Sequence, residues 1–345
     1  MNTALTDRQR YILGLVIDQH VATGTPVGSK HLAGEEGLDV ASSTVRYELA
    51  KLEELGYLDH PHTSAGRVPT ELGYRYYVDH LVSEGPAGAP AVIRSSLEAV
   101  EPRREVETAL TQLADALGHV TNLLSVITAP AASAATIRHV EVLQLQPQLV
   151  MVVVITSTGT VGKRVFSFEE PVDPGLVDWA GALINDRAVG HTVGSRLLAG
   201  RFDEPGMSSV ERDFIDALAP ALLELMDDEA ELLYVGGQAQ VIASRRGADL
   251  QAIDALMRTL EERYALLGLL RTAMSRQEVY LRIGSDFGQR SLTGASMVAA
   301  NYGIPRRNLG TVSVLGPTRM DYRLAISSVR EAARVLSDYL EEVYE

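Results

Sequence analysis

The chain has 345 residues, a hydrophobic fraction of 46%, a formal net charge of −14 and no cysteine. This length predicts roughly two or three domains with a sizeable core, and the composition excludes a largely disordered chain. The lack of cysteine excludes disulfides, thiolate nucleophiles and cysteine zinc sites. No apolar run approaches the ~20 residues that cross a bilayer, and the opening MNTALTDRQR lacks an apolar signal core. We therefore expect a cytoplasmic protein that contacts no membrane.

Two helices joined by a short turn are predicted first. The first runs from Leu5 to Ala22, with Thr6 as its cap, because threonine accepts hydrogen bonds from the free N–H groups of a first turn. Its apolar side chains are Tyr11, Ile12, Leu15 and Val16. Thr25-Pro26 predicts the start of the second helix, since threonine suits the cap and proline the first helical position. Its buried side chains are expected to be Val27, Leu32 and Ala33.

A third helix is predicted to begin at Ser42 or Ser43, either of which suits a cap. One apolar stripe recurs at helical spacing and consists of Val45, Leu49, Leu52 and Leu55. The side chains that fall off this stripe and face outward are Thr44, Arg46, Tyr47 and Lys51. Gly56 ends the helix, because glycine tolerates the positive φ found just past a helix end.

Two short extended segments follow, with a turn-forming HPHTSAG loop between them. The first is Tyr57-Leu58 and the second is Arg67-Val68, which Pro69 ends. Helix, strand, basic loop and strand is the order of a winged helix, and two helices joined by a tight turn match helix-turn-helix docking. On spacing alone, DNA binding and a three-helix packing unit without a ligand are equally favoured.

Charge opposes a non-specific affinity for nucleic acid. Residues 1–80 carry 11 acidic side chains against 7 Lys and Arg, a difference of −4. Affinity for any polyanion depends on phosphate neutralisation, so DNA binding here requires specific contacts and dimerisation. The basic residues that one face can gather are Arg46, Lys51, His60, His62, Arg67 and Arg75.

Residues 26–81 resemble the N-terminal domain of the HrcA family of transcription repressors, and PHTSAGRVPTELGYRYYVD is the most specific run. LGPTRMDY at 315–322 resembles the C-terminal motif of that family, and VYLRIGSDFG at 279–288 and YVGGQAQ at 234–240 are also similar. The resemblance implies a homodimer that represses chaperone operons of the groE and dnaK type. It also implies binding to the CIRCE inverted-repeat operator and activity sustained by the GroEL chaperonin.

We expect the DNA contacts in two places. In the third helix they are Ser42, Ser43, Thr44, Arg46, Tyr47 and Lys51, which face the major groove. In the wing they are His62, Thr63, Ser64 and Arg67, which contact the backbone or the minor groove. The family commonly has asparagine where this chain has Tyr47, and tyrosine cannot pair bidentately with adenine.

The Gly- and Pro-rich run SEGPAGAPA at 83–91 predicts a linker, which we extend over residues 83–105. A heptad pattern then predicts one long helix, and its apolar positions are Val106, Leu110, Leu113, Leu117, Val120, Leu124 and Ile127. Packing within one subunit and a coiled coil between two subunits are equally compatible with that length.

Strands are predicted at VEVLQL (140–145), LVMVVVIT (149–156) and VGKRVFSF, and later at LLYVGG, 279–283, 296–303 and 310–316. Helices are predicted within 172–231, over 248–270 and from Tyr322 to Tyr344. We expect an α+β multidomain chain. By resemblance, residues 106–171 and 232–345 form a GAF-like domain, which a helical dimerisation domain at 172–231 interrupts, and residues 1–82 form the winged helix-turn-helix.

No catalytic motif is present, so we expect neither an enzyme nor a cofactor. His60 and His62 form an H-x-H pair without an evident third metal ligand, and the Gly236-Gly237 pair favours a bend in the chain over a phosphate site. Thr318 and Arg319 suit a helix cap, with Arg319 paired to an acid such as Asp286, or else a small-anion site. A ligand-gated regulator is therefore the alternative hypothesis.

Overall fold

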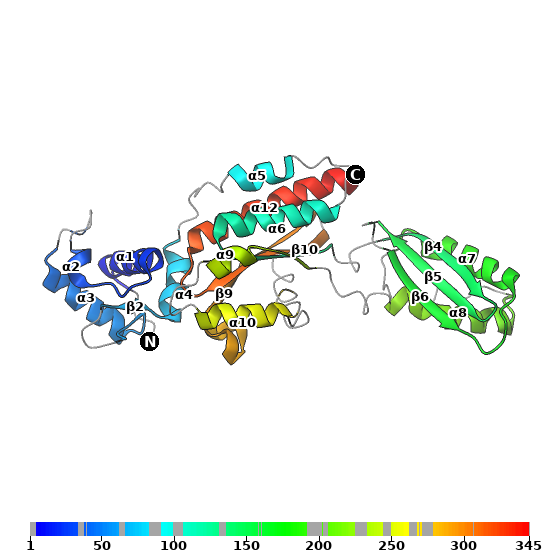
Figure 1. Ribbon diagram of the computed structural model, residues 1–345, viewed down its shortest axis with the longest axis horizontal. Helices are drawn as coiled ribbons and strands as arrows, with labels where there is room; N and C mark the ends of the chain where they lie inside the picture. The colour runs from blue at the N-terminus through cyan, green and yellow to red at the C-terminus, as the bar shows by residue number, and fades with distance from the viewer. Residues whose placement is uncertain are drawn as a thin grey trace. The chain divides into compact units, whose positions relative to one another are not determined.

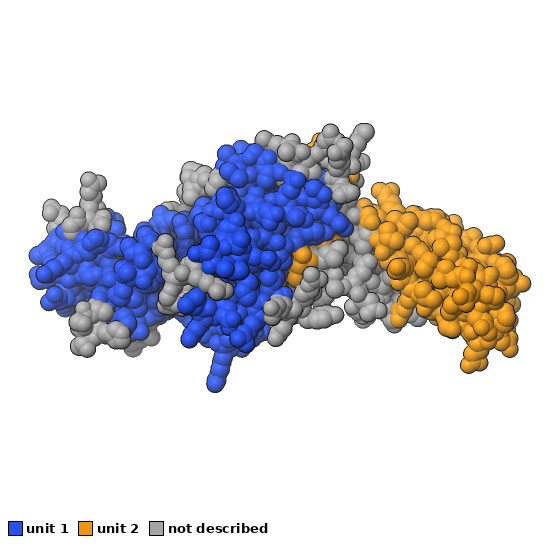
Figure 2. Space-filling view, viewed as in Figure 1, with its two compact units in different colours: residues 1–127, 234–302, 311–339 blue, residues 128–233, 303–310, 340–345 orange. Residues whose placement is uncertain are grey.

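The computed structural model describes residues 5–33, 38, 40–61, 66–82, 91–98, 106–130, 136–157, 159, 161–191, 202, 206–224, 233–243, 250–261, 268, 270, 279–305 and 307–344. They belong to two compact units (Figure 2). Unit 1 consists of Met1–Ile127, Tyr234–Tyr302 and Thr311–Tyr339, and unit 2 of Thr128–Leu233, Gly303–Gly310 and Leu340–Glu345. Within the described ranges, no helix has the length and apolarity needed to cross a membrane.

In the N-terminal segment (residues 5–82), the described residues form four helices and a two-stranded antiparallel sheet. These elements are α1 (Asp7–Thr23), α2 (Ser29–Leu32), α3 (Ser42–Glu54), β1 (Leu58–Asp59), β2 (Val68–Pro69) and α4 (Glu71–His80). Thr6 caps α1 as expected, and Gln9 completes a capping box. The predicted start of α2 at Thr25-Pro26 is wrong. Val27 exchanges two backbone hydrogen bonds of 2.8 Å with Arg67, which keeps this stretch extended and delays the helix to Ser29.

Helix α3 begins at Ser42, but no serine side chain caps it. Ala41 occupies the cap position, and the Ser42 hydroxyl donates to the Ser29 hydroxyl at 3.4 Å, which joins α3 to α2. The buried side chains of α3 are Val45, Glu48, Leu49 and Leu52, so Leu55 is less buried than predicted and Glu48 more so. Gly56 has a φ of +82° just past the helix end, as the sequence indicated.

Unit 1 is built on a five-stranded sheet with the strand order β7-β3-β10-β9-β8. The strands are β3 (Leu124–Thr128), β7 (Leu233–Gly236), β8 (Tyr280–Ile283), β9 (Ala295–Ile304) and β10 (Arg307–Pro317). Strand β3 runs antiparallel to β10, and all five of its residues are buried. In Figure 1, α6 (Val106–Thr121) and α12 (Tyr322–Tyr344) lie on one side of the sheet and α10 (Leu250–Glu261) on the other. The later strands and α12 lie where the sequence predicted them.

The predicted long heptad helix is wrong in its last third. Helix α6 ends at Thr121, Asn122 adopts a left-handed φ of +54°, and Leu124 and Ile127 belong to β3. β-Branched residues and pairing with β10 make this stretch a strand. The apolar positions Leu110, Leu113 and Leu117 are buried inside the chain, which favours packing within one subunit.

The segment predicted as a linker contains a helix, α5 (Ala91–Glu98), which packs against α6. The Arg94 guanidinium also binds Glu331 of α12 at 3.0 Å. Residues 83–90 and 99–105 lie outside the described residues. Helix α5 is therefore part of unit 1 rather than an open connection.

The described residues of unit 2 form an antiparallel three-stranded sheet, with the order β4-β5-β6, and two helices. These elements are β4 (Ile137–Gln146), β5 (Leu149–Thr156), β6 (Val161–Ser167), α7 (Pro174–Ala188) and α8 (Ser209–Glu224). One face of the sheet carries alternating valines, such as Val140 and Val152, which form a core with Val177, Ile184 and Phe214 of the helices. The expected boundary at residue 172 is therefore wrong, because these strands pair with one another and not with the unit 1 sheet.

Gly237 is a glycine on which close backbone packing in unit 1 depends. It has a φ of +77°, and a Cβ at this position would overlap the carbonyl oxygen of Leu123. The neighbouring Gly236 approaches the Ala114 backbone of α6 in the same way. The glycine pair of YVGGQAQ thus serves a close helix contact at the bend between β7 and α9 (Gln238–Ala243).

We predict that Gly237→Ala lowers the free energy of unfolding by about 3 kcal/mol, from left-handed strain and the overlap together. Gly288→Ala is the matched control in unit 1, because Gly288 has a φ of +68° but a Cβ there meets no described atom within 4 Å. It should cost only about 1 kcal/mol of strain. Urea unfolding of both variants measures the difference, and equal losses would contradict the close-packing explanation.

Candidate nucleic-acid interface

Helix α3 presents a small exposed surface that contains most of the predicted groove contacts. Tyr47 is 60% exposed, and Ser43 and Arg46 are also exposed. Thr44 and Lys51 are half-buried on the same helix. Ser42, by contrast, is engaged with Ser29 at the contact with α2. The surface offers one guanidinium, one phenol ring and hydroxyl groups, which can donate to phosphates and contact base edges.

All three acidic side chains of α3 have partners in the N-terminal segment. Glu48 is buried, accepts from the Gln9 amide at 3.1 Å and lies 3.7 Å from the Arg8 guanidinium. Glu53 binds the Arg67 guanidinium at 2.7 Å, and Glu54 binds the Lys51 ammonium at 2.7 Å. The negative charges that oppose DNA binding are thereby largely compensated within the protein.

Lys51 has two neighbours that limit its reach. Its ammonium lies 5.8 Å from the centre of the Tyr47 ring, in a cation–π arrangement. The hydrogen bond to Glu54 raises the pKa of Lys51, so the side chain carries its charge at neutral pH. A phosphate contact by Lys51 therefore competes with Glu54, whereas Arg46 is exposed on the same helix.

The wing candidates divide into two groups. His62, Thr63 and Ser64 lie outside the described residues. Arg67 is described, but its side chain is only 18% exposed and its Nη2 binds Glu53, which also lies 3.9 Å from the ring of His60. Arg67 thus links the second strand of the hairpin to α3, and a phosphate contact by this residue would have to share the guanidinium with Glu53.

Neither the burial of Glu48 nor the pairing of Glu53 with Arg67 was predicted from the sequence. Glu48 follows Val45 by three positions, and this spacing puts it on the buried stripe of α3. This spacing therefore indicates that the Glu48 carboxylate is buried. Glu53 had no such signal, because its partner Arg67 comes from the far side of the hairpin. Lys30 and His31 in α2 are exposed basic residues that the sequence analysis did not single out.

Side chains of helix α4 connect the N-terminal segment to the rest of unit 1. The Glu71 carboxylate accepts from the Ser285 backbone at 3.0 Å and from its hydroxyl at 2.8 Å, and Arg75 forms an ion pair with Asp286. Both partners belong to the short helix η3 (Gly284–Phe287). Asp286 therefore pairs with Arg75, and the expected pair with Arg319 is wrong.

Three further contacts lie at this junction. The Arg323 guanidinium of α12 donates to the Tyr77 hydroxyl at 2.8 Å. Burial raises the pKa of Tyr77, whose hydroxyl keeps its proton and donates to Asp18 of α1. Arg319 donates to the Val21 carbonyl at 3.1 Å, near the end of α1. Thr318 does not cap α12; the Asp321 carboxylate accepts from Leu324 there.

Nothing in the described residues resembles a metal centre. They hold no group of three or more histidine, cysteine or acidic side chains placed to bind a metal ion. His62 of the H-x-H pair lies outside them, and Glu53 is the residue that the structure places beside His60.

Comparison with known proteins identifies the class of protein. Residues 107–326 match the family described as HrcA protein C terminal domain. The chain is 34% identical to the heat-inducible transcription repressor HrcA of Nocardia farcinica, with 99% of both chains covered. It is 29% identical to the repressor of the same name from Bacillus pumilus, again with 99% of both chains covered. A crystal structure described as a hypothetical protein shares the fold, with a TM-score of 0.65 and 22% identity over 99% of this chain and 100% of the other.

The relatives are repressors of transcription, and this is the class to which the protein belongs. More specifically, the chain is a member of the HrcA family of heat-inducible transcription repressors.

We predict that Glu53→Gln lowers the free energy of unfolding by about 1 kcal/mol, because it leaves the largely buried Arg67 without a charged partner. Glu54→Gln is the control. Both members of its ion pair with Lys51 are substantially exposed, and the loss should be only about 0.3 kcal/mol. Thermal unfolding of both variants tests this, and equal losses would show that the Glu53–Arg67 pair does not stabilise the fold.

Proposed function

We propose that the protein represses chaperone operons of the groE and dnaK type by binding the CIRCE inverted repeat as a homodimer in the cytoplasm. The GroEL chaperonin keeps it active, and transcription rises when unfolded proteins occupy the chaperonin. The membership in the HrcA family supports this proposal. A two-fold dimer suits an inverted repeat, because each subunit meets an identical half-site.

The DNA-binding part is a winged helix-turn-helix in residues 1–82. Three observations support it: α2 packs against α3, β1 and β2 form an antiparallel hairpin, and Val27 bridges Arg67 beside that hairpin. In this arrangement α3 is the recognition helix and the loop between β1 and β2 is the wing. The five-stranded sheet of unit 1 is the GAF-like part of the chain.

The single observation that carries the function is the charge arrangement of α3. Arg46 and Tyr47 face solvent, while Glu48 is buried beside Gln9 and Glu53 is paired with Arg67 in the same segment. A net-acidic segment can therefore approach DNA through one locally favourable surface. In the proposed complex Arg46 reads a guanine edge, and Tyr47 contacts a sugar or a thymine methyl group.

A salt titration of binding to a CIRCE duplex and to a scrambled duplex of equal length tests the proposal. We expect tight binding to CIRCE alone, with an affinity that chaperonin increases. The logarithm of the affinity should fall linearly with the logarithm of the salt concentration. Equal weak binding to both duplexes would contradict the operator assignment, and an unchanged affinity with chaperonin would contradict the mode of control.

We predict that Arg46→Ala weakens operator binding by about 1–3 kcal/mol and relaxes specificity at one base position. The matched control is Arg212→Ala, which removes the same charge from α8 of unit 2. Fluorescence anisotropy with wild-type and single-base-changed operators measures both effects. Wild-type affinity in Arg46→Ala would contradict the recognition-helix assignment.

We further propose that unit 2 forms the dimer through the free face of its sheet. The face opposite the core carries apolar side chains that are 36–54% exposed, which are Leu143, Leu145, Ile155, Val161 and Val165. Two cross-strand rows are mainly apolar, one with Leu143, Met151 and Val165 and the other with Ile155 and Val161. An exposed apolar face of this kind favours a protein partner.

Charge indicates how a second copy would pack on this face. The row between the apolar ones has Glu141 on β4, Val153 on β5 and Lys163 on β6. A two-fold axis along the strands places β4 over β6 of the partner, so that Glu141 meets the opposite charge of Lys163 twice. An axis across the strands would place Glu141 against itself. The first arrangement is electrostatically favoured, and sheets pack well with nearly aligned strands.

We predict that Glu141→Lys weakens the dimer roughly tenfold or more, because two like-charge contacts replace two attractive ones. Adding Lys163→Glu should restore most of the affinity, since the charges are then exchanged. Glu170→Lys is the control, because it makes the same charge change in unit 2 outside the strands. Sedimentation equilibrium measures all four dissociation constants, and failure of the double variant to recover would contradict the proposed packing.

A further inference from the structure

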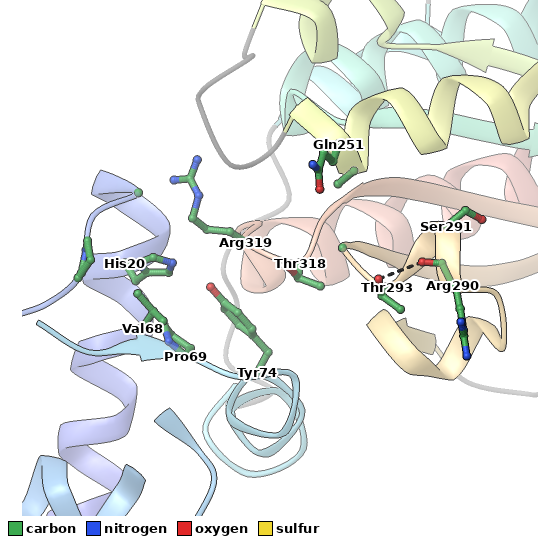
Figure 3. Close-up of a pocket in the computed structure, with 14 residues that line it drawn as sticks. His20, Val68, Pro69, Tyr74, Gln251, Arg290, Ser291, Thr293, Thr318 and Arg319 are labelled. Carbon is green, nitrogen blue, oxygen red and sulfur yellow. Dashed lines mark hydrogen bonds between the residues drawn. The ribbon is translucent and has the colours of Figure 1, made fainter. Parts of the chain in front are cut away.

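Unit 1 contains a cavity of about 660 Å³ between the N-terminal segment and the five-stranded sheet domain (Figure 3). On one side it is lined by the C-terminal end of α1, by β2 and by α4. On the other side it is lined by α10, by the short helix η4 (Arg290–Leu292) and by the loop before α12. The volume lies in the range of small-molecule sites, roughly 300–1,000 Å³.

The side chains that line the cavity have an unusual charge for this chain. Arg319 and His20 contribute basic groups, whereas the Arg290 side chain points away in Figure 3, and no Asp or Glu is among the described residues that line the cavity. The whole chain, by contrast, has a net charge of −14. Basic groups gathered on a concave surface without carboxylates favour a negatively charged occupant.

Hydrogen-bond donors complement these basic groups. Figure 3 shows His20, the hydroxyl end of Tyr74 and Thr318 around a common space, with the Gln251 amide above it. Hydroxyl, amide and guanidinium groups are the donors that bind phosphate and carboxylate oxygens. One N–H of the Arg319 guanidinium donates to the Val21 carbonyl. This hydrogen bond holds the Arg319 side chain across the junction between the two sides of the cavity.

The cavity also has an apolar part. Pro26, Val68 and Pro69 line it on the side of the N-terminal segment, and the Tyr74 ring adjoins them. A bare inorganic ion would leave most of the volume and this apolar surface without contacts. The lining therefore suits an organic anion about the size of a sugar phosphate or a tricarboxylate.

We propose that this cavity binds a small organic anion, which strengthens the attachment of α1 and α4 to the sheet domain. The anion contacts Arg319 and Thr318 on one side and His20 and Tyr74 on the other. A ligand held between the two sides stabilises their packed arrangement by the free energy of its binding. It thereby favours one orientation of α3, and it adds metabolic control to a repressor that responds to heat.

The test is binding to the full-length chain, with glucose 6-phosphate, citrate and inorganic phosphate as probes at 10 mM and KCl at equal ionic strength. We expect glucose 6-phosphate or citrate to raise the unfolding temperature above the KCl value, and inorganic phosphate to raise it less. The first two probes distinguish a phosphate ester from a polycarboxylate. An equal shift in KCl, or no shift with either organic anion, would overturn the proposal.

Variants locate the site. Thr318→Val and Arg319→Gln should weaken binding of the effective probe at least tenfold by calorimetry. The matched control is Arg330→Gln, which removes an exposed guanidinium from α12 and does not line the cavity. It should bind the probe as the wild type does. Unchanged affinity in both cavity variants, or an equal loss in Arg330→Gln, would place the binding elsewhere and contradict the assignment.

Discussion

The ion pair between Glu53 and Arg67 is the interaction on which the N-terminal segment depends. Glu53 belongs to α3, and the Arg67 backbone bridges Val27 ahead of α2, so one pair joins the third helix, the hairpin and the approach to the second helix. It also compensates the negative charge of the Glu53 carboxylate. The three glutamates of α3 are held in contacts of this kind, while Arg46 and Tyr47 on the same helix are exposed.

Polar contacts likewise join helix α4 to the rest of unit 1. Glu71 and Arg75 bind η3, and Tyr77 connects Asp18 of α1 to Arg323 of α12. These polar contacts adjoin the cavity lined by Tyr74 and Arg319. Polar junctions are weaker and more reversible than an apolar core, since each contact replaces hydrogen bonds to water. The attachment of the N-terminal segment is therefore suited to adjustment by a ligand or a partner.

Unit 2 offers an apolar contact surface instead of a polar junction. Its strands alternate between valines that pack on α7 and α8 and an outer face with apolar rows. A three-stranded sheet with one uncovered apolar face is a natural contact for a second copy of the chain. The opposite charges of Glu141 and Lys163 favour one orientation of the second copy on that face. A two-fold dimer of this kind would suit the proposed inverted-repeat operator, which links the proposed assembly to the repressor function.

The sequence by itself determined the elements whose signals are local. Thr6 capped α1, Gly56 ended α3, and β9, β10 and α12 lie where alternation and helical spacing predicted them. The exposure of Arg46 and Tyr47 followed from spacing alone, and the family followed from motifs. The wing residues His62, Thr63 and Ser64 and the DNA contacts themselves remain predictions.

Only the tertiary structure decided which segments meet. Val27 is extended because Arg67 pairs with it from forty positions away along the chain, and Leu124 leaves the heptad helix because β10 pairs with β3. By their sequence alone, the strands of unit 2 are compatible with either the three-stranded or the five-stranded sheet. Caps and periodicity depend on neighbours within a few residues, whereas pairing between distant segments depends on packing that no local pattern contains.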